Sequence, residues 1–150
     1  SSDLIAERHP GGRGVVTTAC YIARRYGCRS AMPMFRAMQL CPHAVVIPPN
    51  MAKYKAVSGD IRAIFSDVSD CIEPLSLDEA FLDVTSEHRT SERLPAIMLA
   101  EAQQRIEREI GITVSIGLSY NKFLAKLASD LQKPRGYSII GRAEARDFLT

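Results

Sequence analysis

The chain has 150 residues, of which 46% are hydrophobic and 24% charged, and its formal net charge is +2 at pH 7. These values are typical of one globular domain with a real core, and they exclude a disordered or a membrane chain. No apolar run approaches the roughly 20 residues of a membrane-spanning helix, so we expect a cytoplasmic protein without a membrane partner. The four cysteines lack the spacing of a zinc site or a disulfide framework, which indicates small core side chains in a reducing compartment.

Turn and capping residues divide the first half of the chain into short elements. They predict, in order, a loop (1–14), a strand (15–16), a helix (17–26), a second helix (34–40), a strand (44–47) and a long amphipathic helix (50–68). The first helix has Thr17 or Thr18 as its cap and Gly27 at its C-terminal end.

The second half alternates strands and helices. It predicts two short strands within 71–84, a polar linker (87–92), an amphipathic helix (95–110), a strand (112–116), a helix (123–131), a strand (137–140) and a last helix from 142. This order favours an α+β fold of ferredoxin-like type, with an antiparallel or mixed sheet and helices packed on one face. The helix pair at 17–41 forms a small helical appendage to it.

Positive charge is concentrated before residue 60. From Arg8 through Gly59 the chain has six arginines and two lysines and no Asp or Glu. Counterion release and phosphate contact make a polyanion the natural partner of such a segment. A solvated basic face without a partner explains the charge equally well.

Two adjacent carboxylates, Asp78 and Glu79, stand where the two short strands meet. On a straight strand they would point to opposite faces, whereas at a turn they can converge. Close carboxylates repel, and Mg²⁺ held by one or two carboxylates plus substrate phosphates relieves that repulsion. The alternative is an acidic hairpin tip in solvent, because acids are common turn residues.

A second candidate lies on the first predicted helix, where Tyr21 and Arg24 share one face. The guanidinium can clamp triphosphate oxygens while the tyrosine donates its hydroxyl. The alternative is a tyrosine ring that packs over an arginine stem.

Four sets of residues, in one order along the chain, resemble the Y-family, DinB-type DNA polymerases. They are a fingers segment (13–16, 18–24 and 30–33), the palm signature (75–84), a second palm motif (115–117 with 121–130) and a Lys-Pro-x-Gly turn (133–136). The resemblance implies an irregular N-terminal segment (1–11), fingers (12–50), a palm (51–141) and the start of a thumb (142–150). It also implies low-fidelity, translesion DNA synthesis on primer–template DNA from deoxynucleoside triphosphates, with a sliding clamp as partner of the full-length enzyme.

The same resemblance implies roles for single residues. Asp78 and Glu79 would be the catalytic carboxylates that bind two Mg²⁺ ions. The incoming nucleotide would contact residues of both the fingers and the palm, namely Thr18, Tyr21, Arg24, Ala31 and Lys133. The DNA would contact Ser76, Gly117, Ser119 and Lys122.

The chain also departs from the family pattern. These polymerases open with an apolar strand that carries another metal-binding aspartate and is followed by aromatic residues, and Asp3 has no such surroundings. The resemblance also implies a complete thumb and a little-finger domain that grips DNA, and we expect this fragment to lack both. We therefore expect a palm-and-fingers fragment that binds nucleotide weakly and extends primers little or not at all by itself, which a primer-extension assay checks.

Two other classes share part of the pattern. A nucleotide cyclase also has a ferredoxin-like palm with paired metal carboxylates, but the fingers match and the Lys-Pro-x-Gly turn argue against it. A non-catalytic nucleic-acid-binding module of RRM type stacks bases on exposed strand aromatics, and Phe81 is the only strand aromatic expected before Tyr137. Such a module would hold nucleic acid equally well in EDTA.

Overall fold

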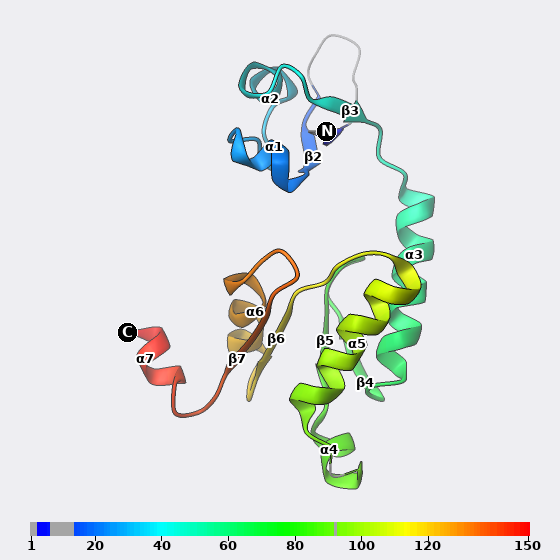
Figure 1. Ribbon diagram of the computed structural model, residues 1–150, viewed down its shortest axis with the longest axis vertical. Coiled ribbons are helices and arrows are strands. Elements are labelled where there is room, and N and C mark those ends of the chain that lie inside the picture. Colours follow the sequence, from blue (N-terminus) through cyan, green and yellow to red (C-terminus); the bar gives the residue numbers. More distant parts are fainter. Residues whose placement is uncertain (1–2, 7–13, 92) are drawn as a thin grey trace. The chain divides into compact units, whose positions relative to one another are not determined.

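The computed structural model describes residues 3–6, 14–91 and 93–150 (Figure 1). The chain separates into two compact units, Ser1–Met51 and Ala52–Thr150, and each unit is described by itself. The division falls one residue beyond the expected end of the fingers at residue 50. The assignment of the units to fingers and palm remains a prediction.

The first unit contains a three-stranded sheet of order β2-β1-β3 and two short helices. Its elements are β1 Asp3–Ala6, β2 Val16–Ala19, α1 Tyr21–Arg25, α2 Met34–Leu40 and β3 Val45–Ile47. β1 is central, antiparallel to β2 and parallel to β3. The predicted loop over 1–14 is therefore wrong for β1, because its pairing partners lie ten or more residues away and leave no local signal. Residues 7–13 lie outside the described part.

The first helix is also shorter than predicted. Thr17 and Thr18 belong to β2, and the cap of α1 is Cys20, whose sulfur accepts a hydrogen bond from the Ala23 amide at 3.4 Å. A thiol is a weak acceptor, so the sequence gives little sign of this cap. The helix nevertheless ends near Gly27, which has a φ of +91°.

The core of the first unit is built from small side chains. Its fully or nearly buried members are Val16, Ala19, Ala23, Cys28, Ala37 and Cys41. Burial, with Cys41 and Cys20 close by, raises the pKa of the Cys28 thiol above its ordinary value. The interpretation of the cysteines as core side chains is confirmed for Cys28 and Cys41, whereas Cys71 is exposed.

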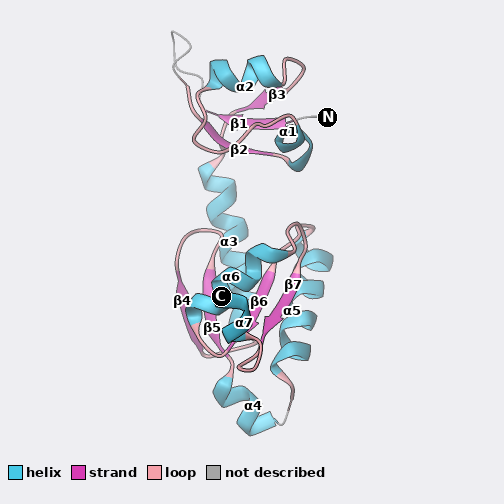
Figure 2. Ribbon diagram, turned by 90° about the vertical axis from the view of Figure 1, so that its left-hand side faces the viewer, coloured by secondary structure: helices cyan, strands magenta, loops and turns pink. Residues whose placement is uncertain are grey.

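The second unit, with the helix that leads into it, contains two two-stranded ladders and five helices in the described part of the chain. The elements are α3 Met51–Ser66, β4 Cys71–Pro74, β5 Ala80–Asp83, α4 Thr85–Ser91, α5 Pro95–Ile110, β6 Ile116–Ser119, α6 Lys122–Leu131, β7 Tyr137–Ile140 and α7 Ala145–Leu149. β4 and β5 are antiparallel, and β6 and β7 are parallel. In both ribbon views β5 lies next to β6, although the two belong to different ladders (Figures 1 and 2).

Two predictions for this unit are wrong in position. The expected polar linker at 87–92 is largely helix α4, which begins where the Asp83 carboxylate accepts a hydrogen bond from the Thr85 amide at 3.0 Å. The expected strand at 112–116 is shifted, since the ladder with β7 runs from Ile116 to Ser119. The β-branched residues before Ile116 have the propensity of a strand, but they pair with no strand in the described part of the chain.

Gly117 allows the β6 backbone to lie directly against the backbone of α6. A Cβ atom at this residue would stand 2.0 Å from the Ala125 carbonyl oxygen and 2.4 Å from the Ser129 amide nitrogen, both in α6. Backbone therefore meets backbone, which a side chain of any size would prevent. On the other side of the unit, Ile64 of α3 packs with Ala102 and Ile106 of α5.

The α+β fold class is confirmed by this arrangement of helices and small sheets. Among the described helices, none combines the length and the apolar character that crossing a bilayer requires.

Candidate active site

The two predicted carboxylates lie in the turn between β4 and β5, residues 75–79, which we call the acidic loop. The loop is closed by the Glu79 carbonyl, which accepts hydrogen bonds from the amides of Leu75 at 2.9 Å and Ser76 at 3.3 Å. The Ser76 hydroxyl donates to Asp78 Oδ1 at 2.7 Å and accepts from the Asp78 amide at 3.3 Å. The expected position of the pair at a hairpin turn is confirmed, and Ser76 orients one of its carboxylates.

Helix α3 supports the acidic loop from one side. The Ser58 hydroxyl, in a residue only 6% exposed, donates to the Leu77 carbonyl at 2.5 Å. Arg62 Nη2, one turn later, donates to the Ser76 carbonyl at 3.2 Å. Neither residue was expected at the site from the sequence. A small polar side chain on the buried face of α3, four residues after Tyr54, was the available signal for Ser58.

Helix α6 approaches the same hairpin with two lysines. Lys126 forms an ion pair with Glu79, and Lys122, one turn earlier, forms an ion pair with Glu73 of β4. The Lys122 ammonium also lies 5.8 Å from the centre of the Phe81 ring. Lys122 was expected at the DNA backbone and here contacts the hairpin, whereas Lys126 was given no role although it stands inside the second motif.

The chemistry of the acidic loop fits a hard divalent cation. Asp78 and Glu79 supply oxygen donors, and Glu79 already holds a positive group, the Lys126 ammonium. In the described part of the chain, no three His, Cys, Asp or Glu side chains are placed to hold a metal together. Mg²⁺ is commonly held by one or two carboxylates with waters and substrate phosphates, so two carboxylates match the protein's share of such a site.

Three of the expected nucleotide contacts are brought together in the first unit. Arg24 Nε donates to the Ala19 carbonyl at 2.8 Å, and Arg24 Nη2 donates to the Thr18 hydroxyl at 3.3 Å. The guanidinium carbon lies 5.9 Å from the centre of the Tyr21 ring, which is 53% exposed. The Arg24 guanidinium is therefore held by residues of β2, and the Tyr21 ring beside it is exposed to solvent.

Ala31, the expected contact of the nascent base pair, has a backbone that L-residues rarely adopt. Its φ is +65°, and its amide donates to the Val16 carbonyl at 2.8 Å. The neighbouring Met32 carbonyl accepts from the Val16 amide at 2.9 Å, so pairing to β2 holds the strained residue in place. Strain of this kind concentrates at functional sites.

The remaining predicted residues make contacts within the second unit. Lys133 pairs with Asp130 at 2.6 Å, and this pairing lowers the pKa of the Asp130 carboxyl. The Ser119 hydroxyl donates to the Ile140 carbonyl at 2.6 Å, which links β6 to the end of β7. The structure brings neither Ser119 nor Gly117 into contact with the carboxylates of the acidic loop, and it gives both a role in packing.

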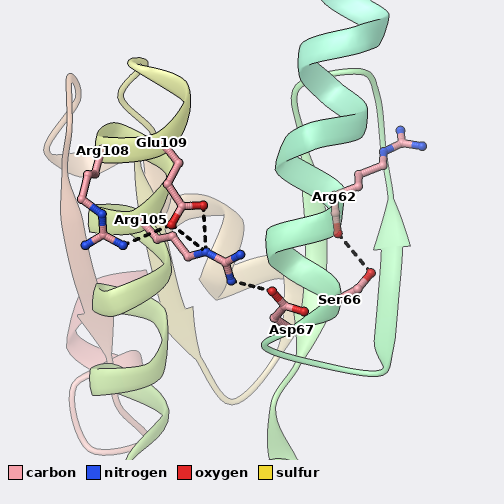
Figure 3. A network of polar contacts seen from close by, with 6 residues as sticks. All are labelled: Arg62, Ser66, Asp67, Arg105, Arg108 and Glu109. Atoms are coloured by element: carbon pink, nitrogen blue, oxygen red, sulfur yellow. Dashed lines mark hydrogen bonds and ion pairs between the residues drawn. The ribbon is translucent and has the colours of Figure 1, made fainter.

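A pocket of about 200 Å³ lies elsewhere, between α3 and α5. Ligand sites usually measure about 300–1,000 Å³, and the charged side chains around this pocket are paired with one another. Arg105 Nη1 lies 2.5 Å from Asp67 Oδ2 and Arg105 Nε lies 3.0 Å from Glu109 Oε2 (Figure 3). The pKa of the Glu109 carboxyl is lowered, mainly by the hydrogen bond from Arg105 and further by the one from Arg108. This network fastens α5 to α3, and no predicted site residue belongs to it.

Comparison with known proteins gives consistent matches. The profile of the impB/mucB/samB family matches residues 3–130. DNA polymerase IV of Brucella melitensis is 59% identical over 139 residues, which are 93% of this chain and 31% of that protein. DNA polymerase IV of Listeria monocytogenes is 50% identical over 146 residues, which are 97% of this chain and 41% of that protein.

Solved structures agree with these relatives. DinB from Sulfolobus solfataricus superposes with a TM-score of 0.92 at 35% identity, over 99% of this chain and 43% of that one. An insertion ternary complex of Dbh DNA polymerase gives the same TM-score at 34% identity, over 99% of this chain and 44% of that one. The chain thus spans less than half the length of each of these relatives. Since the family profile matches most of the chain and the Y-family resemblance of its motifs is confirmed, the chain belongs to the impB/mucB/samB family of Y-family polymerases.

Proposed function

We propose that this chain carries the fingers and palm of a DNA polymerase IV-type enzyme that synthesises DNA on a template with low fidelity, past lesions. The observation that carries the proposal is the acidic loop, where Asp78 and Glu79 are held at a hairpin turn by contacts from two helices. It stands in a chain that is 59% identical to a protein named DNA polymerase IV. The substrates would be primer–template DNA and deoxynucleoside triphosphates.

In this proposal Asp78 and Glu79 hold two Mg²⁺ ions together with the triphosphate. When bound, these ions lower the pKa of the primer 3′-hydroxyl and neutralise charge on the leaving pyrophosphate. The chain's own contribution is orientation. Ser76 fixes one oxygen of Asp78, and Ser58 and Arg62 fix the backbone of the loop, so that the carboxylates need little rearrangement before reaction.

Five residues would contact the nucleotide, as the family resemblance implies: Thr18, Tyr21, Arg24, Ala31 and Lys133. Arg24 presents a guanidinium already oriented by the Ala19 carbonyl and Thr18, and Tyr21 adds a hydroxyl beside it. Lys133 would act as a point charge toward the phosphates, in exchange for Asp130. Ala31 would leave room beside the nascent base pair.

Four further residues would lie near the DNA: Ser76, Gly117, Ser119 and Lys122. For Lys122, a phosphate would replace Glu73 as the partner of the ammonium. Gly117 and Ser119 would act indirectly, by holding β6 against α6 and β7.

Calorimetry of deoxynucleoside triphosphate binding, with and without Mg²⁺, tests this function. We expect Mg²⁺-dependent binding that the Asp78→Asn, Glu79→Gln double variant loses. Glu73→Gln is the matched control, since it removes an acid of the same hairpin that lies outside the acidic loop. Binding that the double variant retains unchanged would contradict the assignment of the metal site to this loop.

A sliding clamp as partner of the full-length enzyme and the cytoplasm as its location are expectations from the family. The two alternatives, an RRM-type module and a nucleotide cyclase, gain no support from the matches described above. Nucleic-acid binding that is the same in EDTA and in Mg²⁺ would revive the binding module.

A further inference from the structure

The Lys126–Glu79 ion pair joins a residue without an assigned role to one of the two proposed metal ligands. Lys126 projects from the second turn of α6, and its side chain is 38% exposed, while that of Glu79 is 39% exposed. The contact spans 47 positions of the sequence, so it depends on the folded unit and not on local propensity. It is an ion pair at the position where the proposed function requires a cation.

We propose that Lys126 is a stand-in cation at the acidic loop, whose ammonium occupies Glu79 until a divalent ion takes that carboxylate. This inference rests on the proposed function, because it concerns the same carboxylate. Lys126 is thus a positioning residue that acts through Glu79. It keeps the carboxylate turned toward the site and neutralised when no ion is bound.

The physical properties of the pair suit a temporary partner. A lysine ammonium is a compact charge on a flexible four-carbon stem, so it can leave without movement of the helix. Exposed ion pairs contribute little to stability, so breaking this one costs little. A divalent ion binds a carboxylate more strongly than one ammonium does, and the displaced ammonium remains beside the phosphates that the ion brings.

The chain offers a matched comparison in Lys122. Lys122 stands four residues before Lys126 on the same face of α6. It forms an ion pair with Glu73, a carboxylate of the same hairpin that lies in β4 and outside the acidic loop. Replacing either lysine by methionine removes one charge from the same region. A difference between the two variants therefore reports competition at Glu79 and not general electrostatics.

The test is binding of Mn²⁺ alone to the whole chain, followed by the electron paramagnetic resonance signal of the free ion. We expect Lys126→Met to bind Mn²⁺ roughly two- to fivefold more tightly than the natural sequence, the fold-change that loss of an exposed ion pair corresponds to. Lys122→Met should bind within about 1.5-fold of it. Unchanged or weaker binding in Lys126→Met, an equal gain in both variants, or no binding in any of the chains would overturn the inference.

Two further measurements separate this inference from the function beneath it. In ¹⁵N spectra of the lysine ammonium groups, added Mg²⁺ should shift the Lys126 signal and leave that of Lys122 in place; the reverse would overturn the inference. The Asp78→Asn, Glu79→Gln variant should lose Mn²⁺ binding. If the double variant loses Mn²⁺ binding while Lys126→Met binds as the natural chain does, only the stand-in role of Lys126 is refuted. If the double variant binds Mn²⁺ as the natural chain does, the proposed metal site is refuted as well.

Discussion

Ser58 connects the interior of α3 to the acidic loop by one hydrogen bond, to the Leu77 carbonyl. Ser58→Ala removes the donor, so we expect the free energy of unfolding to fall by about 1 kcal/mol, the usual net value of such a bond. Nucleotide binding should weaken too, since the loop loses a support. Urea unfolding and calorimetry measure the two effects.

Ser66→Ala is the control for this prediction. The Ser66 hydroxyl is exposed and donates to the Arg62 carbonyl of its own helix (Figure 3). Its removal should change stability by less than about 0.5 kcal/mol and leave nucleotide binding as it was. An equal loss in both variants would mean that the contact with Leu77 has no special importance.

The environment of Tyr137 makes us expect the free energy of unfolding to depend on pH in the alkaline range. Its hydroxyl donates to the Ala96 carbonyl at 2.7 Å, and burial raises its pKa above the ordinary value of 10.0. The unfolded chain therefore loses this proton first, and the contribution of Tyr137 to stability, complete below pH 10.0, declines as the pH rises through the folded-state pKa. Urea unfolding at pH 8.5 and at pH values above 10 should show a smaller decline for Tyr137→Phe than for the natural chain. Equal slopes would refute this.

At the scale of the element, the contact between β6 and α6 depends on Gly117. Gly117→Ala would push a methyl group against the α6 backbone, and we expect the free energy of unfolding to fall by about 1–3 kcal/mol, the usual cost of overpacking. Gly59→Ala is the control, because Gly59 lies inside α3 with no atom within 4 Å of the added Cβ. It should stabilise the chain by about 0.5–1 kcal/mol through helix propensity. Thermal unfolding measures both, and a Gly117→Ala chain as stable as the natural one would contradict the packing described.

Elements with local signals at both ends were predictable from the sequence. Helix α5 begins at Pro95 and ends before Gly111, whose φ is +78°, and both of its bounds match the expectation. β1 was missed because both of its partners are distant strands, and β6 was placed too early because its position depends on Gly117.

The candidate site shows the same division. The acidic loop stands out in the sequence, since Asp78 and Glu79 are neighbours in the chain. Its supports do not, because Ser58, Arg62 and Lys126 contact it across 14 to 47 positions. Residue type and spacing carry no record of such contacts.

At the scale of the whole molecule, the two units have separate cores. Cys41→Ser places a hydroxyl in the fully buried position of a thiol, and we expect it to weaken the first unit by about 1–3 kcal/mol. Hydrogen exchange followed by mass spectrometry should show faster exchange in peptides from β2 to α2 and unchanged exchange in α5 and α6. Faster exchange throughout the chain would show that the two units unfold together.

The close approach of β6 to α6 at Gly117 has a consequence for timing at the acidic loop. Because the β6 backbone contacts the α6 backbone directly, we expect α6 to keep its place while Lys126 exchanges partners by rotation about its side-chain bonds. Rotations of exposed side chains take picoseconds to nanoseconds, whereas movements of whole helices take microseconds or longer. On this basis the departure of Lys126 from Glu79 would not limit the rate at which a metal ion binds that carboxylate.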